Sequence, residues 1–191
     1  MKEISLKYMK GIVLLDDENH EELSKYIWSI LYGPNTSYAR TSIKENGIFK
    51  HYLMHRLIMN NPKGFEVDHI DNNGLNNQMS NLRLVTHSQN QMNSHKYKDK
   101  TSKYKGVMWH KRDKIWEVQI KANNKQHYLG RFENEIQAAI MYNIATEILH
   151  KEYAFPNDIE KECPSLTQED IKLLKESIRN NNKLMKRLER L

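Results

Sequence analysis

The sequence predicts an α+β protein with two small domains. Short β-prone runs alternate with short helical segments along its 191 residues, a length that supports two small cores but not a large multidomain assembly. The lysine-bearing segment 94–103 has the composition of a basic linker. We therefore expect domains at 1–93 and 104–157, followed by a helical tail at 158–191.

Composition excludes several classes of protein. The mean hydropathy is −0.84 and the sequence lacks an apolar run long enough to cross a membrane, so we expect no membrane-spanning helix. The mixed Lys/Glu N-terminus lacks the apolar stretch of a signal peptide. The single cysteine, Cys163, allows neither an internal disulfide nor a cysteine-based zinc site. We expect a soluble, intracellular protein whose metal ligands, where it has any, are His, Asp or Asn.

The charge favours an anionic polymer, such as a nucleic acid, as the partner. Lys and Arg number 30 against 24 Asp and Glu, a net charge of +6. Residues 104–131 carry seven Lys/Arg and two acids, whereas residues 132–157 carry one Lys and four acids. We infer that the second domain has one basic face and one acidic face.

The N-terminal segment predicts short apolar runs, a helix and a hairpin. The runs lie at 4–6 and 11–15, and Asp16 is expected to cap a helix over residues 16–31. Asn46-Gly47 then supplies the positive φ angles of a tight turn between two β-prone arms, at 37–43 and 48–53. A short helix is expected over residues 55–59.

The role of the hairpin stays open between a nucleic-acid contact and a solvated edge, and we expect contact. Its candidate side chains are Tyr38, Arg40, Lys44, Lys50 and His51.

The segment after the hairpin predicts two short strands and a helix. The β-prone runs at 67–70 and 82–85 flank a polar loop, and a helix is expected over residues 86–93. Thr86 and Gln89 match a capping box at the start of that helix.

Polar residues in this segment could hydrolyse a phosphodiester. The reaction needs a base for water and a cation that neutralises charge on the phosphate and the leaving oxygen. One carboxylate with one amide oxygen is a hard-oxygen site that suits Mg²⁺, which keeps its waters and takes further ligands from phosphates. The candidates are Asp68, His69, Asn81 and Asn90.

Single residues in this segment carry little weight alone. Asparagine occurs 20 times, so one asparagine spacing is uninformative. Asp71, Asn73 and Gly74 imitate a calcium loop, yet His69 and Ser80 stand where that loop needs its first and last ligands. The informative pattern is the whole string.

That string is Val67-Asp-His-Ile-Asp-Asn-Asn-Gly-Leu-Asn-Asn followed by Ser80-Asn-Leu-Arg-Leu-Val-Thr-His-Ser-Gln-Asn-Gln-Met-Asn93. With the lead-in Met54-His-Arg-Leu-Ile-Met59, it resembles the HNH endonucleases, most closely the phage-type HNH homing endonucleases. The resemblance implies a ββα-metal fold, a hairpin plus one helix, with its motif core over 54–93.

The resemblance also implies roles for individual residues. It makes His69 the general base, Asp68 and Asn90 the metal ligands, and Asn81 the residue that pins the loop and orients the His69 ring. Asparagine rather than histidine at the last position favours Mg²⁺ or Mn²⁺ over zinc or nickel. His87, on the same helical face as Asn90, could touch phosphate, cap the helix or face solvent.

His55, in the lead-in, is expected to be structural. It belongs to the string that carries the resemblance but is given no part in the chemistry.

From residue 104 the sequence predicts three strands and one helix. The strands are expected at 105–110, 116–122 and 126–132, separated by polar turns. Asn134 is expected to cap the helix, whose isoleucines repeat every four residues beside small alanines that let it lie close on a sheet.

This segment resembles the APETALA2-type (ethylene-response-factor) DNA-binding domain. The matching motifs are Tyr104-Lys-Gly-Val-Met-Trp109, Trp116-Glu-Val-Gln-Ile120 and Tyr128-Leu-Gly-Arg-Phe132. The resemblance implies a three-stranded antiparallel sheet that is packed on one helix and lies in the major groove of DNA. By matched position the DNA-facing residues are Lys105, His110, Arg112, Trp116, Gln119, Lys121 and Tyr128.

Two positions depart from the plant pattern, and two tryptophans allow another interpretation. Met108 and Gln119 differ from the residues usual in that family, so its target sequence does not transfer. Trp109 and Trp116 could be core residues instead of DNA contacts.

The tail predicts an amphipathic helix over residues 165–191, begun by Thr167 and Asp170. Its apolar stripe covers fewer than three heptads and is interrupted by three asparagines at 180–182, so we expect packing on the protein's own domains and a monomer rather than a homodimer. A monomer with one HNH site would nick one strand, whereas a dimer could cut both.

Together these features predict a site-specific, homing-type DNA endonuclease that hydrolyses double-stranded DNA with Mg²⁺ or Mn²⁺. We expect it in the cytoplasm of a bacterial or phage-infected host cell, not secreted. The alternative is a non-catalytic DNA-binding transcriptional regulator, which would not need the residue set of Asp68, His69 and Asn90. An RNA-directed protein is disfavoured because the major groove of A-form RNA is too narrow for the sheet.

Overall fold

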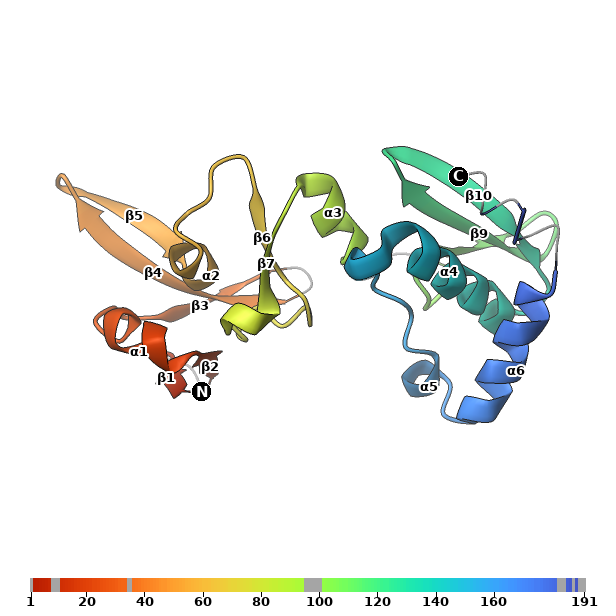
Figure 1. The fold of residues 1–191 in the computed structure, drawn as a ribbon, viewed down its shortest axis with the longest axis horizontal. Helices are drawn as coiled ribbons and strands as arrows, with labels where there is room; N and C mark the ends of the chain where they lie inside the picture. The colour runs from red at the N-terminus through yellow and green to blue at the C-terminus, as the bar shows by residue number, and fades with distance from the viewer. Residues whose placement is uncertain are drawn as a thin grey trace. The chain divides into compact units, whose positions relative to one another are not determined.

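The computed structural model describes residues 2–7, 11–33, 36–94, 101–181, 185, 186 and 188. The α+β class is confirmed: the chain consists of helices and small antiparallel sheets (Figure 1). It divides into two compact units, 1–91 and 92–191. In the described part of the chain, none of the helices has the length and apolar character needed to cross a membrane.

The first unit is built from three small sheets and three short helices. In chain order its elements are β1 (Lys2–Ser5), β2 (Ile12–Leu15), α1 (Asp17–Leu23), β3 (Ser29–Tyr32), β4 (Ser37–Glu45), β5 (Ile48–Leu53), α2 (Met54–Ile58), β6 (Glu66–His69), a 3₁₀ turn (Met79–Asn81), β7 (Leu82–Val85) and α3 (His87–Met92), the last of which runs one residue past the boundary between the units. The sheets pair β1 with β2, β3 with β4 and β5, and β6 with β7. The buried core of this unit includes Val13 and Leu15 of β2, Trp28, and Met54 of α2.

The helix expected over residues 16–31 is only partly present. α1 ends at Leu23, residues 24–28 form a turn and an irregular connection, and β3 begins at Ser29 and pairs Ile30 with Ala39 of β4. The local periodicity cannot show this pairing, because it depends on a strand that comes later in the chain.

The hairpin and the short helix after it are confirmed. Asn46 and Gly47 both have positive φ, +50° and +83°, and connect β4 to β5. The strand–strand–helix order expected over residues 67–93 is also present, and Thr86 and Gln89 form the expected capping box.

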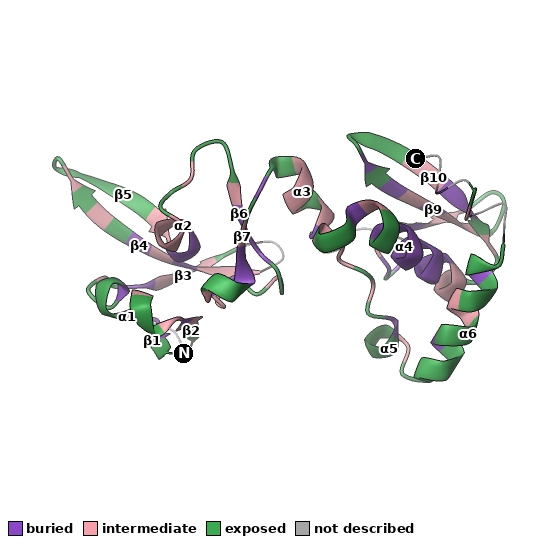
Figure 2. Cartoon of the chain, viewed as in Figure 1, coloured by how far each residue is buried: buried purple, intermediate pink, exposed green. Residues whose placement is uncertain are grey.

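The second unit packs a three-stranded sheet against one long helix. Its elements are β8 (Val107–His110), β9 (Ile115–Ala122), β10 (Lys125–Phe132), α4 (Glu135–His150), a 3₁₀ turn (Lys151–Tyr153), α5 (Ile159–Glu162) and α6 (Gln168–Arg179). The sheet order is β10-β9-β8, and buried residues of α4 face it (Figure 2). The Asn134 cap is confirmed, since its side chain accepts from the amides of Ile136 and Gln137.

One glycine is required where the sheet approaches α4. Gly106 has φ +76°, and a Cβ added there would lie 1.9 Å from the ring of Tyr142.

The isoleucine stripe predicted for α4 faces the core over most of its length, but Ile148 is 41% exposed.

The tail differs from expectation in two places. α6 begins at the predicted capping box of Thr167 and Asp170 but ends at Arg179, because Asn180 forms its C-cap. α5, which the sequence analysis does not predict, precedes it. Residues 95–100 of the expected linker and 182–184, 187 and 189–191 of the expected tail helix lie outside the described residues.

Candidate active site

The candidate site is built on the β6–β7 hairpin and the helix that follows it. Asp68 and His69 are the last two residues of β6, Asn81 immediately precedes β7, and Asn90 lies on α3. All four predicted residues therefore belong to one hairpin-plus-helix segment of the first unit.

The loop between the strands is anchored on β2. The Leu14 amide donates to the Leu75 carbonyl at 3.0 Å, and the Asn77 amide donates to the Leu14 carbonyl at 2.7 Å. Asp16 stands at the N-cap position of α1, but no side-chain cap hydrogen bond forms there; its carboxylate instead accepts from the Met79 amide at 2.7 Å. The predicted cap residue thus holds the loop.

Asn81 fixes the same loop from the inside. Its Oδ1 accepts from the Asp71 amide at 3.0 Å, and its Nδ2 donates to Asp71 Oδ1 at 2.9 Å and to the Asn76 carbonyl at 2.8 Å. Both Nδ2 hydrogens are therefore used on the loop. The sequence analysis expects Asn81 to pin the loop and to orient the His69 ring, and these hydrogen bonds agree with the first of the two roles.

Asn77, which the sequence analysis does not single out, contacts the His69 ring. Its side chain is fully buried, and its Oδ1 lies 3.4 Å from His69 Nε2. Among 20 asparagines, nothing in the sequence distinguishes this position, because the contact depends on how the loop folds back.

His69 is buried in an aromatic cluster. It is 5% exposed, and its ring centroid lies 4.8 Å from that of His55 and 5.9 Å from that of Tyr38. Burial lowers the pKa of His69 below 6.5, although Asn77 and the carboxylates of Asp71 and Asp68 oppose the shift. The imidazole is therefore neutral at neutral pH and can accept a proton.

His55 is more deeply perturbed. Its Nδ1 is buried without a hydrogen-bond partner, and burial, with the positive charge that His69 and Arg56 can carry, lowers the pKa of His55 to about 3. It packs edge-on against His69, at an interplanar angle of 81°. His55 is thus a neutral wall of the site.

Asp68 is paired with an arginine that the sequence analysis does not single out. Arg83 lies opposite it in the β6–β7 register and donates from Nε at 2.9 Å and from Nη2 at 2.8 Å, both to Asp68 Oδ2. The two side chains are 7% and 17% exposed, so each compensates a largely desolvated charge.

Asn90 is held by a carboxylate on β6. Its Nδ2 donates to Glu66 Oε2 at 2.5 Å, and His87 Nδ1 lies 2.8 Å from Glu66 Oε1. Burial alone would raise the pKa of Glu66, but the hydrogen bonds from Asn90 and His87, together with the positive charge that His87 and Arg56 can carry, outweigh it and the pKa is lowered. The His87 side chain is 74% exposed, as expected for the solvent-facing role left open for it, and its contact with Glu66 is one that the sequence analysis does not predict.

The donors fit a hard divalent cation. Asp68 offers a carboxylate, and because the amide nitrogen of Asn90 is engaged by Glu66, its Oδ1 is the atom left for a ligand. Within the described residues, no three His, Cys, Asp or Glu side chains gather as a metal cluster, so a cation there would also depend on water and substrate oxygens.

The predicted DNA-facing residues of the second unit divide into two groups. Gln119, Lys121 and Tyr128 share the sheet face opposite α4, as the register of β9 with β10 requires, and Arg112 lies in the exposed β8–β9 turn. His110, at the end of β8, accepts from the Asp113 amide at 3.3 Å.

Lys105 and Trp116 lie elsewhere and correct that prediction. Trp116 packs against the α4 core and against Trp109, at a ring distance of 4.8 Å. Burial lowers the pKa of Lys105 to about 8, and its Nζ donates to the carbonyls of Met92 and Ser94 at 2.7 and 2.6 Å. Lys105 is used to hold the chain that leads into the second unit.

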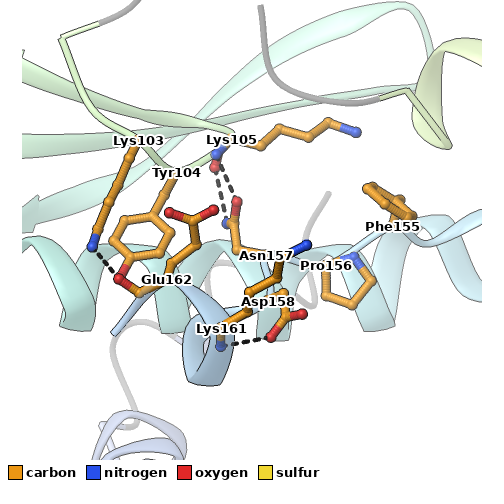
Figure 3. Close-up of a pocket in the computed structure, with 9 residues that line it drawn as sticks. All are labelled: Lys103, Tyr104, Lys105, Phe155, Pro156, Asn157, Asp158, Lys161 and Glu162. Carbon is orange, nitrogen blue, oxygen red and sulfur yellow. Dashed lines mark hydrogen bonds between the residues drawn. The ribbon is translucent and has the colours of Figure 1, made fainter. Parts of the chain in front are cut away.

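Figure 3 shows how the backbone of Lys105 is held in a pocket of the second unit. The Lys105 backbone amide and carbonyl both hydrogen-bond to the side chain of Asn157, at 2.6 and 3.2 Å, while its ammonium points away from the pocket. Lys103 Nζ donates to the Glu162 carbonyl on the opposite side of the pocket.

Arg131, which the sequence analysis does not assign to the DNA-facing set, lies on the outer face. It binds Asp113 and Glu117, at 2.9 and 2.8 Å, so acids neutralise part of that face.

Comparison with known proteins identifies the first unit. The family model described as HNH endonuclease matches residues 52–92. The chain is 37% identical over 93 residues to Protein 3.8 of Escherichia phage T7, an alignment that covers 49% of this chain and 76% of that protein. The chain belongs to the HNH endonuclease family. It is also 40% identical over 116 residues to the Uncharacterized HNH endonuclease L560 of Acanthamoeba polyphaga mimivirus.

The second alignment covers 58% of this HNH-family chain and 57% of the mimivirus protein. The chain thus spans little more than half the length of that relative. The family match contains Asp68, His69, Asn81 and Asn90, and also His55, Glu66, Asn77 and Arg83.

The stability of the first unit is expected to depend on the protonation of His55. Because its pKa in the folded state, about 3, lies below the ordinary 6.5, the unfolded chain binds the proton more readily. The contribution of neutral His55 to the free energy of unfolding is complete at pH values above the ordinary pKa. It is lost progressively as the pH falls toward the pKa of the folded state. Urea unfolding between about pH 7 and pH 4, followed by amide signals of β6 and β7, measures it.

His55→Phe should flatten this pH dependence relative to the parent, whereas His51→Phe, on the exposed strand β5, should not. An unchanged slope in His55→Phe would show that His55 does not titrate as its burial requires.

Proposed function

We propose that this chain is a metal-dependent, site-specific DNA endonuclease of the homing type that nicks double-stranded DNA. The observation that carries the proposal is His69, a neutral buried imidazole adjacent in sequence to the carboxylate of Asp68, with its loop held by Asn81. HNH nucleases generally depend on a divalent metal, and the oxygen donors of this chain fit Mg²⁺ or Mn²⁺ better than a softer ion.

The contact between His69 and Asn77 suggests which ring nitrogen is the base. An amide oxygen can only accept, so Nε2, 3.4 Å from Asn77 Oδ1, carries the ring proton and Nδ1 is left unprotonated. Nδ1 then takes a proton from water as the water attacks phosphorus. The bond between phosphorus and the 3′ oxygen breaks, and the leaving 3′ oxygen takes a proton from solvent. The products are a 5′-phosphate and a 3′-hydroxyl.

The other residues hold the reacting groups in place. Asp68 and Asn90 would hold the cation, which when bound supplies charge neutralisation at the phosphate and at the leaving 3′ oxygen. Arg83 fixes the Asp68 carboxylate through two hydrogen bonds, from Nε and Nη2, to Oδ2. With one base in one site, a monomer cuts one strand.

The second unit is proposed to be the DNA-reading module. Support comes from the resemblance of residues 104–157 to the APETALA2-type domain and from polar side chains on the sheet face opposite α4. Gln119, Lys121 and Tyr128 are proposed to face the major groove, with Arg112 and His110 at its edge. This unit would supply site preference, and the first unit would supply the chemistry.

The nuclease proposal predicts that His69→Ala lowers the cleavage rate by at least about 100-fold, because a general base contributes at least that much. Cleavage of a supercoiled plasmid pool with random inserts, in Mg²⁺, in Mn²⁺ and in EDTA, measures it. DNA binding in a gel shift should be unchanged, since His69 is buried and contributes no phosphate charge.

His20→Ala changes a half-buried histidine on α1 of the same unit and should behave as the parent in both assays. Full cleavage in EDTA would contradict the metal mechanism, and binding without cleavage in any metal would favour the transcriptional regulator.

The reading-module proposal predicts that Lys121→Ala weakens DNA binding by the full-length chain and reduces its salt dependence by about one counterion, as loss of one phosphate contact requires. Gel shifts across a salt series in the His69→Ala background measure it. Lys151→Ala removes the same charge beyond α4 and should leave the salt dependence unchanged. Equal effects of the two variants would contradict the assignment of the sheet face.

A further inference from the structure

A carboxylate on β6, that of Glu66, binds two side chains of the helix that carries Asn90. α3 is six residues long and has no buried residue among those described. Two of its side chains form hydrogen bonds to Glu66 of β6. Asn90 Nδ2 lies 2.5 Å from Glu66 Oε2, and His87 Nδ1 lies 2.8 Å from Glu66 Oε1. Because no described residue of this short helix is buried, we expect the two hydrogen bonds to Glu66 to contribute to the position of Asn90 relative to β6.

Glu66 lies on the same side of β6 as Asp68. Residues two apart on a strand point to the same face, so the carboxylate that holds Asn90 is next in line to the carboxylate proposed as a metal ligand. Glu66 therefore connects the two halves of the proposed ligand pair, one on the hairpin and one on the helix.

The direction of each hydrogen bond determines the orientation of the Asn90 amide. An ionised carboxylate only accepts, so Asn90 must present its NH₂ to Glu66 and turn Oδ1 away. A free asparagine could rotate its amide by half a turn and present NH₂, which cannot bind a cation. Glu66 removes that alternative.

His87 and Gln91 complete the same chain of hydrogen bonds. His87 donates from Nδ1 to Glu66, which leaves Nε2 as an acceptor, and Gln91 Nε2 lies 2.9 Å from it. Both Glu66 oxygens are thus occupied by donors of α3. This occupation favours a supporting role for the carboxylate over direct ligation.

We propose that Glu66 is a positioning residue for the metal site: it orients the Asn90 amide so that Oδ1 faces the cation, and it docks α3 on β6. This inference rests on the proposed function of Asp68 and Asn90 as metal ligands. Groups that orient metal ligands in this way typically change metal affinity by about 10- to 100-fold when removed.

The test compares two substitutions in the full-length chain. Glu66→Leu removes the acceptor, and Glu66→Gln keeps the shape and one acceptor oxygen for Asn90 while losing the charge. Mn²⁺ affinity is measured by the electron paramagnetic resonance signal of free Mn²⁺, and cleavage is measured across a Mn²⁺ series. Glu45→Leu is the matched control, because Glu45 also accepts from two side chains, Lys50 and Tyr52, but on the β4–β5 hairpin.

Glu66→Leu is expected to weaken Mn²⁺ binding by about 10- to 100-fold and to raise the Mn²⁺ concentration for half-maximal cleavage equally, while the rate at saturating Mn²⁺ is retained. Glu66→Gln is expected to bind Mn²⁺ as the parent does. A purely structural role would instead lower the saturating rate along with the folded fraction.

Equal losses in Glu66→Gln and Glu66→Leu would overturn the inference, because they would make Glu66 a direct ligand. An affinity in Glu66→Leu no different from that in Glu45→Leu would overturn it as well. If Glu66→Leu does not fold, Glu66→Gln alone decides the case. A carboxylate that binds the cation directly cannot be replaced by an amide without loss of Mn²⁺ affinity. A parent that cleaves no DNA in Mn²⁺ would instead refute the proposed function.

Discussion

The antiparallel register of β6 and β7 is the constraint on which the candidate site depends. It pairs Asp68 with Arg83 and His69 with Leu82, so the carboxylate finds its counter-ion. A slip of one residue would turn every side chain of one strand to the opposite face, separating Asp68 from Arg83. The loop that sets this register is anchored from within by Asn81 and from outside by β2.

The two adjacent residues at the end of β6, Asp68 and His69, are both buried but differ in how the cost of burying a charge is avoided. His69 avoids the cost of a buried charge by remaining neutral, walled by His55 and Tyr38. The carboxylate of Asp68 is instead paired with the Arg83 guanidinium. A base and an anion can therefore be neighbours in one small site at neutral pH. This combination is what metal-assisted hydrolysis requires of the protein.

Local signals in the sequence predicted much of the fold. The Asn46-Gly47 turn, the capping boxes at Thr86 and Thr167 and the Asn134 cap all depend on residues close in sequence, and all are present. The helix over 16–31 failed because β3 pairs with a strand that comes later in the chain.

The sequence predicted candidate site residues only where the HNH-like motif contains them. The motif contained Asp68, His69, Asn81 and Asn90, but the partners of these residues arise from tertiary contacts that residue spacing does not encode. Trp116 is different: its alternation with Val118 and Ile120 already indicated the core side of the sheet. Lys105 looked like a surface charge, yet its ammonium binds backbone carbonyls.

The most direct test of the central claim is the position of a bound cation. A crystal of the protein soaked in Mn²⁺ would locate the ion by its anomalous scattering. One ion is expected between an oxygen of Asp68 and Oδ1 of Asn90, at a bond length slightly above the roughly 2.0–2.1 Å typical of Mg²⁺, with water in its other positions. An ion bound instead to the Asp71 loop, or one that touches neither Asp68 nor Asn90, would contradict the assignment of the active site.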